Sequence, residues 1–187
     1  EKERKMGKNI LVLTGSPRSK GNSNALADAF VEELLTAGHT VERFNAGKKK
    51  IKGCIACQKC YSKDGMACIY GDDFNELAPM VERADMLVLV TPLYWFTFPA
   101  QIKAAIDKIY ALMLGQRNLK IKSSVLMCCS EANDMADFEG IVRTWELIGN
   151  YLKWELQEPF LVPNVNEPGD ILATDALTRA KLLAESL

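Results

Sequence analysis

The chain has 187 residues, of which 48% are hydrophobic and 25% charged, and its formal net charge is −1. These proportions are typical of a soluble globular protein and exclude a chain that is mainly disordered. The near-neutral charge gives no reason to expect nucleic acid as a partner. No apolar run approaches the roughly 20 residues that a membrane span needs, so no membrane partner is expected.

The predicted elements alternate strand and helix along the chain. Short apolar runs predict strands, and apolar residues spaced three or four apart predict helices. In chain order the strands are expected at Asn9–Thr14, Thr40–Asn45, Asp85–Thr91, Lys122–Cys129 and Lys153–Val162. The helices are expected at Ser23–Ala37, Asp72–Arg83, Pro99–Leu114, Phe138–Leu152 and Asp170–Leu187. This order predicts an α/β fold in which helices cover both faces of a parallel sheet.

The domain organisation expected from length is a single domain over residues 8–187. Residues 1–7 are expected to be a charged leader, in which Met6 fits a natural start. No basic-then-apolar leader opens the chain, so no signal peptide and a cytoplasmic location are expected. The single histidine, His39, stands in a predicted helix-to-strand turn and is expected to be structural, which leaves no histidine for a serine triad.

Ligands of parallel sheets bind outside the carboxyl ends of the strands. Three loops are expected there: Gly15–Ser23, Pro92–Phe98 and Ser130–Asp137. The first loop offers hydroxyls, an amide and a guanidinium at a helix start, which suits a phosphate monoester. It fits neither the Walker loop nor the dinucleotide fingerprint G-x-G-x-x-G. A plain Ser/Gly turn that caps the helix is the alternative.

The sequence GSPR after the first strand, together with TPLYWF and the helix QIKAAIDK after the third, resembles the flavodoxin-like NAD(P)H-dependent FMN reductases over Lys8–Leu187. The resemblance implies a three-layer fold with a five-stranded parallel sheet of order 2-1-3-4-5. It also implies FMN as cofactor and NAD(P)H as co-substrate. The residues it implies for FMN binding are Ser16, Arg18, Ser19, Ser23, Asn24, Pro92, Leu93, Tyr94, Trp95, Phe96, Ser130 and Glu131.

The aromatic loop has two interpretations. Four aromatic residues in five positions, Tyr94–Phe96 and Phe98, are hard to bury in one small domain, so contact with flavin is favoured over plain core packing. A part of the loop in an interface beside the flavin is compatible with that contact. A homodimer, or a dimer of such dimers, is therefore expected.

Four of the six cysteines, Cys54, Cys57, Cys60 and Cys68, fall within 15 positions of a long functional loop predicted at residues 46–71. This spacing indicates metal or redox chemistry rather than a disulfide framework. It resembles the cysteine motif of iron–sulfur flavoproteins, a branch of the same family, which implies that the four thiolates bind a [4Fe–4S] cluster. The alternatives are reduced thiols without a cluster, a Zn(Cys)4 site and a redox dithiol. Cys128 and Cys129 end a predicted buried strand and are expected to serve packing.

The function that the resemblance implies is an FMN-dependent NAD(P)H oxidoreductase that reduces a flavin, quinone or nitro-type acceptor. The cofactor supplies the chemistry, so no catalytic side chain is predicted. One alternative is an iron–sulfur flavoprotein that carries electrons between a ferredoxin-like donor and an acceptor. Another is a flavin- or metal-binding redox sensor without turnover.

Overall fold

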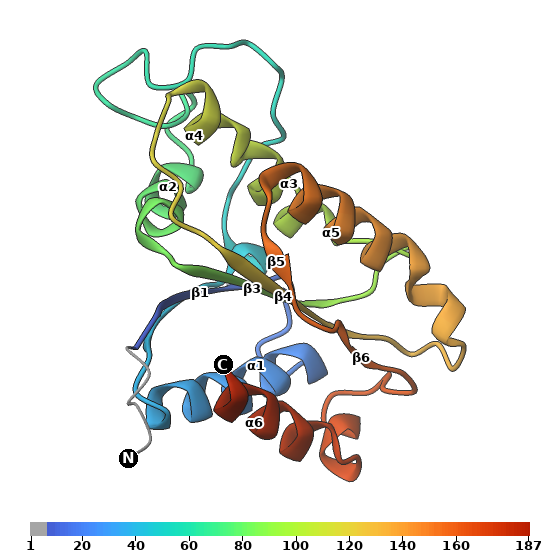
Figure 1. Ribbon diagram of the computed structural model, residues 1–187. Coiled ribbons are helices and arrows are strands. Elements are labelled where there is room, and N and C mark those ends of the chain that lie inside the picture. Colours follow the sequence, from blue (N-terminus) through green and yellow to red (C-terminus); the bar gives the residue numbers. More distant parts are fainter. Residues whose placement is uncertain (1–6) are drawn as a thin grey trace, which may run out of the picture.

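A computed structural model describes residues 7–187 of the chain (Figure 1). Residues 1–6 of the predicted charged leader, which include Met6, lie outside the described residues. No helix of the described part is long and apolar enough to cross a membrane.

The centre of the fold is a parallel sheet. Its long strands are β1 (Asn9–Thr14), β2 (Thr40–Phe44), β3 (Met86–Pro92) and β4 (Ser123–Cys129). The strand order β2-β1-β3-β4-β5 confirms the predicted order and the flavodoxin-like fold. In β1, β3 and β4 almost every residue is buried, as expected of strands covered on both faces.

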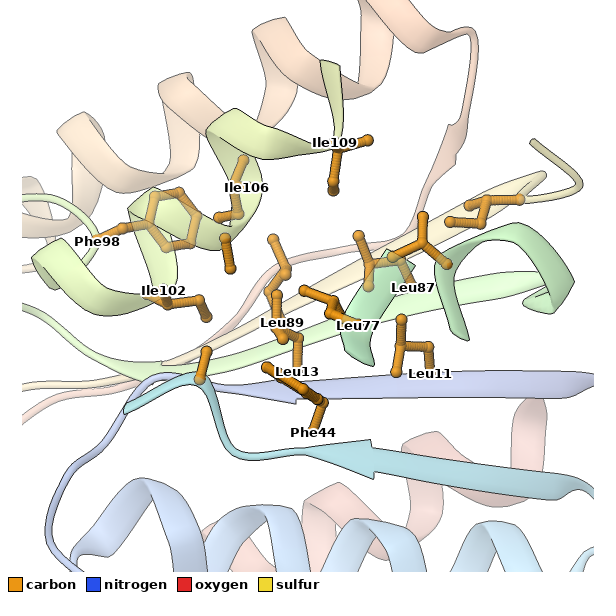
Figure 2. Close-up of a cluster of buried hydrophobic side chains, with 14 of the residues drawn as sticks. Leu11, Leu13, Phe44, Leu77, Leu87, Leu89, Phe98, Ile102, Ile106 and Ile109 are labelled. Atoms are coloured by element: carbon orange, nitrogen blue, oxygen red, sulfur yellow. The ribbon is translucent and has the colours of Figure 1, made fainter. Parts of the chain in front are cut away.

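Helices cover both faces of this sheet (Figure 1). One layer holds α1 (Asn22–Thr36) and α6 (Ala176–Ser186). The other holds α2 (Phe74–Arg83), α3 (Ala100–Lys108), α4 (Tyr110–Leu114) and α5 (Glu139–Leu152). Strand side chains alternate between the two cores, so that Leu11 and Leu13 face the second layer while Ile10 and Val12 face the first. Figure 2 shows Leu11 and Leu13 beneath α2 and α3, with Ile102 and Ile106 of α3 opposite them.

The fifth strand differs from its prediction. Lys153–Val162 was expected to be continuous, but the structure has two short strands, β5 (Glu155–Leu156) and β6 (Phe160–Val162), which both pair with β4. The sheet therefore has six strands rather than five. Pro159 stands between the two pieces and has no N–H to donate to the ladder, which explains the break.

Two predicted helices are also interrupted. Pro99–Leu114 divides at Ile109, whose N–H bonds to the carbonyl of Ile106 at 3.1 Å, three residues back, as in a tightened turn. Asp170–Leu187 divides into a 3₁₀ turn (Asp170–Ala173) and α6, because Thr174 is extended. Its hydroxyl accepts a hydrogen bond of 3.1 Å from the N–H of Ala176, the first residue of α6. Of the other predicted elements, Asn9–Thr14 coincides with β1, and the rest differ from the observed ones by one or two residues at their ends.

Candidate functional site

A cavity of about 710 Å³ lies at the carboxyl ends of the strands. Its walls are the loops after β1, β3 and β4, together with residues 165–168 after β6. This is the position where an open parallel sheet binds its ligand. We refer to it as the main cavity.

One end of the main cavity is formed by the loop between β1 and α1. Ser16, Arg18 and Ser23 line it, and both serines are buried. The 15-residue helix α1 begins here with no side chain capping its first turn. Free first-turn N–H groups, two hydroxyls and a guanidinium are what an anion at a helix N-terminus requires. This end of the cavity therefore fits a phosphate group.

Polar contacts hold the β1–α1 loop in shape. The Asn24 side chain donates to the carbonyl of Arg18 at 2.6 Å and accepts from the Arg43 guanidinium at 3.0 Å. Asn22 donates to the carbonyl of Glu167 at 2.9 Å and accepts from Gly169 N–H at 3.0 Å, which ties the 165–168 wall to this loop. The loop is thus fixed from α1, from β2 and from the segment after β6.

A close backbone approach supports the same loop from beneath. Gly47, in the 3₁₀ turn Ala46–Lys48 after β2, lies so close that a Cβ there would stand 2.5 Å from the carbonyl carbon of Ser16. Only glycine fits at this distance. Neither Gly47 nor Asn22 was predictable from the sequence, because neither contact is local in the chain.

The aromatic loop after β3 forms a second wall. Tyr94 and Thr97 exchange two backbone hydrogen bonds of 3.0 Å, which close a two-residue turn at Trp95 and Phe96. Tyr94, Trp95 and Phe96 all line the main cavity and all are exposed, whereas Phe98 is buried in the core. A planar apolar ring could lie against this wall.

The third wall follows β4. Ser130 and Glu131 line it, as does Asp137 from the turn before α5. The Ser130 hydroxyl accepts a hydrogen bond of 3.0 Å from Ala132 N–H. Of the residues that line the main cavity, only Arg18 is basic, so the cavity has a basic phosphate end and two acidic side chains elsewhere.

Ten of the twelve residues predicted for FMN binding come together in this cavity. They are Ser16, Arg18, Ser23, Pro92, Leu93, Tyr94, Trp95, Phe96, Ser130 and Glu131. Asn24 and Ser19 do not line it: Asn24 holds the loop, and Ser19 accepts a hydrogen bond of 2.7 Å from the Lys48 ammonium. The cavity also contains residues that were not predicted, among them Asn22, Cys129, Asp137, Val165 and Asn166.

The four clustered cysteines line a separate, much smaller recess with Lys108, Tyr110 and Ala111, which we call the cysteine recess. Cys54 is exposed and the other three are half-buried. Burial raises the pKa of Cys60, and the nearby thiols, Cys68 first among them, raise it further. No residue is shared with the main cavity. In Figure 1 the segment is the teal loop that extends over α2 and α4.

The cysteine segment is closed at its base. Asp72 accepts hydrogen bonds from Lys52 N–H at 2.9 Å and from the Lys108 ammonium at 2.5 Å. Asp73 accepts a further one from Lys50 N–H at 2.7 Å. The side chains of Lys108 and Asp72 are 2% and 6% exposed, so this ion pair is buried. The bonds join residues 50–52 to residues 72–73 in what we call the neck of the segment.

Other contacts fix the segment beyond the neck. Asn75 of α2 accepts from Cys68 N–H at 2.8 Å and donates to its carbonyl at 3.0 Å. At the far end the Tyr61 hydroxyl donates to Glu82 at 2.9 Å, and burial followed by this bond raises the pKa of Tyr61 to about 12. The segment therefore has a defined shape although residues 49–73 contain no helix or strand.

Within residues 7–187 no group of three or more Cys, His, Asp or Glu side chains is arranged to hold a metal ion. The four thiols share one recess but do not have the geometry of a tetrahedral ion site. Cys128 and Cys129 are buried, and burial raises the pKa of both thiols, that of Cys129 to about 12. Their predicted packing role agrees with their position in the cores on the two faces of the sheet.

Comparison with known proteins gives consistent results. The model of a family described as NADPH-dependent FMN reductase matches residues 8–137, more than half of the chain. An iron-sulfur flavoprotein of Archaeoglobus fulgidus is 37% identical over 97 residues, which are 52% of this chain and 43% of that protein. An FMN-dependent NADH:quinone oxidoreductase of Pseudoalteromonas atlantica is 31% identical over 111 residues, 54% of each chain.

Among solved structures, the NAD(P)H:quinone oxidoreductase from Methanothermobacter marburgensis superposes with a TM-score of 0.70 at 20% identity, over 96% of each chain. At a sequence identity of 20%, this structural similarity supports a shared fold and nothing further. The chain spans about half the length of the curated iron-sulfur flavoproteins that it matches.

Proposed function

Because the chain belongs to the NADPH-dependent FMN reductase family, we propose that it is an FMN-dependent NAD(P)H oxidoreductase that reduces a small-molecule acceptor of the flavin, quinone or nitro type. The observation that carries this proposal is the main cavity, in which a phosphate-binding helix start and an aromatic turn meet at the carboxyl ends of the strands. Bound FMN would supply hydride acceptance from NAD(P)H and electron delivery to the acceptor.

The residues of the chain would bind and orient the cofactor. Ser16, Ser23 and Arg18, with the first-turn N–H groups of α1, would hold the phosphate. The wall formed by Pro92–Phe96 would lie along the flavin ring, and Ser130 and Glu131 would approach it from the loop after β4. Asn24 would act indirectly, by fixing the carbonyl of Arg18.

The cofactor assignment is tested with FMN and riboflavin, which differ by the phosphate alone. Arg18→Ala is expected to weaken FMN binding about tenfold, since a charge-assisted hydrogen bond contributes about 1.5–3 kcal/mol and Arg18 is exposed. Riboflavin binding should not change. Lys20→Ala is the matched control, because Lys20 is an exposed basic neighbour outside the cavity wall. Equal effects of Arg18→Ala on both flavins would contradict the phosphate assignment.

Turnover is tested by anaerobic oxidation of NADPH and NADH with menadione as acceptor. Oxidation that depends on added FMN is the expected result. A protein that binds FMN but oxidises neither nucleotide would instead favour the redox-sensor alternative, and a protein that binds no FMN would contradict both.

A second candidate is an iron–sulfur flavoprotein in which Cys54, Cys57, Cys60 and Cys68 bind a [4Fe–4S] cluster. It is supported by the shared recess and by relatives with that name. Positive φ values at Ala56 and Gln58 add support, because left-handed residues within a loop turn N–H groups to one side, as in many anion and iron–sulfur sites. Iron and sulfide counted after anaerobic purification test it: about four of each are expected, and none would contradict it.

We also propose a homodimer, because Trp95, Phe96 and Tyr94 remain exposed on the described surface. Light scattering measures the mass in solution. A mass of two chains or an even multiple is expected, and a single chain at micromolar concentration would contradict the proposal.

A further inference from the structure

The segment after β6 forms a wall of the main cavity that the sequence did not predict. Residues 164–170, which we call the strap, contain the lining residues Val165, Asn166 and Pro168. In Figure 1 the strap belongs to the orange-red connection between β6 and α6. It lies outside residues 8–137, which the family model matches, so membership of that family does not by itself assign the strap a role.

The backbone of the strap is restricted near both ends. Asn164 has a φ of 58° and Gly169 a φ of 102°, in the left-handed region that asparagine and glycine adopt more readily than other residues. Pro163 and Pro168 restrict the backbone further, because a proline ring fixes φ. The strap is therefore built as a stiff connection.

Backbone hydrogen bonds tie the strap to the loop after β4 and to its own last residue. The N–H groups of Asn164 and Val165 donate to two carbonyls of that loop, at 3.0 and 2.9 Å. The Asp170 carboxylate accepts from the N–H groups of Asn166 and Glu167, at 2.9 and 2.8 Å. Asp170 thus holds the middle of the strap, where a residue lines the main cavity.

The other end of the strap is tied to the start of α1. The Asn22 side chain donates to the carbonyl of Glu167 at 2.9 Å and accepts from Gly169 N–H at 3.0 Å. It also accepts from Ile171 N–H at 3.3 Å, just beyond the strap. Asn22 is buried and lines the main cavity with Ser16. The strap therefore borders the end of the cavity that fits a phosphate group.

The strap adds no charge to the main cavity. Its three lining residues are uncharged, and all six of its backbone N–H groups already donate within the protein, Pro168 having none. A phosphate would therefore gain no hydrogen bond from the strap backbone. Charges steer association, whereas most other differences in affinity lie in the dissociation rate. An uncharged wall of this kind is expected to act on the escape of a bound molecule.

We propose that Asn22 and Asp170 are positioning residues that hold the strap against the phosphate end of the main cavity, where the strap slows the departure of bound FMN. This inference rests on the proposed function and deepens it. Asn22 holds the strap from the start of α1, and Asp170 holds it from within. The two residues therefore share the strap but not the β1–α1 loop, and neither takes part in a chemical step.

The test removes the two ties separately, in Asn22→Ala and Asp170→Ala. Asp175→Ala is the matched control, because Asp175 is an exposed carboxylate shortly after the strap that lies outside the main cavity and pairs with Arg179. Stopped-flow flavin fluorescence measures the association and dissociation rates of FMN. Hydrogen exchange of the apoprotein, followed by NMR, measures the protection of the N–H groups of the strap.

Both variants are expected to release FMN about tenfold faster, which corresponds to about 1.4 kcal/mol, while the association rate changes about twofold at most. Hydrogen exchange should become faster at Gly169 in Asn22→Ala, and at Asn166 and Glu167 in Asp170→Ala, because these N–H groups lose their acceptors. Asp175→Ala should match the wild type in both measurements.

Four results would overturn the inference. Faster exchange with an unchanged dissociation rate would mean that the strap does not retain FMN, and unchanged exchange in both variants would mean that these side chains do not position it. Faster release in Asn22→Ala alone would assign the effect to the β1–α1 loop. Equally fast release in Asp175→Ala would assign it to a general loss of stability. Failure of the proposed function differs from all of these, because the wild type would then bind no FMN, while exchange of the apoprotein would still test the two ties.

Discussion

Gly47→Ala is expected to weaken FMN binding although Gly47 does not line the main cavity. The added Cβ would stand 2.5 Å from the carbonyl carbon of Ser16 and 2.6 Å from the carbonyl oxygens of Gly15 and Ser16. Ordinary contact begins near 3.4 Å, so the β1–α1 loop and the 3₁₀ turn must separate by about 0.9 Å. All three neighbouring atoms belong to backbone and cannot rotate away. Overpacking of this kind costs about 1–3 kcal/mol, and each 1.4 kcal/mol that falls on the bound state corresponds to about a tenfold change in Kd.

The assay is quenching of flavin fluorescence on titration of apoprotein with FMN. The Kd of Gly47→Ala for FMN is expected to rise about 10- to 100-fold, and the Kd for riboflavin should rise less, because the displaced loop is the one proposed to bind the phosphate. Gly53→Ala is the matched control, since nothing lies within 4 Å of a Cβ at that glycine of the same connection. A wild-type Kd for FMN in Gly47→Ala would refute the claim that this contact shapes the β1–α1 loop.

Three further outcomes follow from burial and strain. Burial raises the pKa of Asp72, but hydrogen bonds, that from Lys108 first, outweigh it and hold the pKa below its usual 3.8. The buried ion pair of Lys108 and Asp72 should therefore stabilise the fold above about pH 4, and this stabilisation should be lost as the pH falls through the lowered pKa of Asp72. Lys108→Met should reduce the free energy of unfolding by about 3–5 kcal/mol at pH 7, because it leaves the Asp72 carboxylate buried without its partner. Urea denaturation measures this change, and an unchanged midpoint would contradict it. Iodoacetamide at pH 8 should label the exposed thiol of Cys54 and spare that of Cys129, because burial raises the pKa of Cys129 to about 12. Peptide mass spectrometry measures the labelling of each cysteine, and equal labelling would be inconsistent with the burial of Cys129. Trp95→Asn should relieve about 1 kcal/mol of backbone strain and raise Tm by about 2–4 °C in calorimetry, and a fall in Tm would show that the ring stabilises the fold.

The fold was predictable because its determinants are local. Continuous apolar runs such as Met86–Val90 define the central strands, and their buried pattern follows directly from the sequence. The prediction of one continuous fifth strand was wrong, because a single residue, Pro159, interrupts a run whose composition otherwise suits a strand. The tightened turn at Ile109 had no comparable sign in the sequence.

The site was predictable only where its residues follow a strand directly. Ser16, Trp95 and Ser130 come from the loops after β1, β3 and β4, so the alternation of strands and helices predicts that they meet. Asn22 and Gly47 act across the fold, through the carbonyl of a residue 145 positions away and through a backbone approach. No spacing in the sequence reports either contact. The role of the clustered cysteines remains a prediction, because their spacing brings the four thiols to one recess but does not fix the geometry in which they would bind a ligand.

The neck gives the cysteine segment an independence that matters for its evolution. The bonds of Asp72 and Asp73 to residues 50–52 close the segment at its base, so the length of its exposed part can change without moving β2. Cys68 and Tyr61 also bond to α2, so these two positions are tied to the rest of the fold. The entropy of closing a loop grows slowly, by about 0.6 kcal/mol for each doubling of length. The cysteines share no lining residue with the main cavity, so a lineage could replace them while the main cavity stays intact. Moving residues 50–73 into a flavodoxin-like host would therefore require a lysine opposite Asp72 and the α2 partners of Tyr61 and Cys68, which are Glu82 and Asn75.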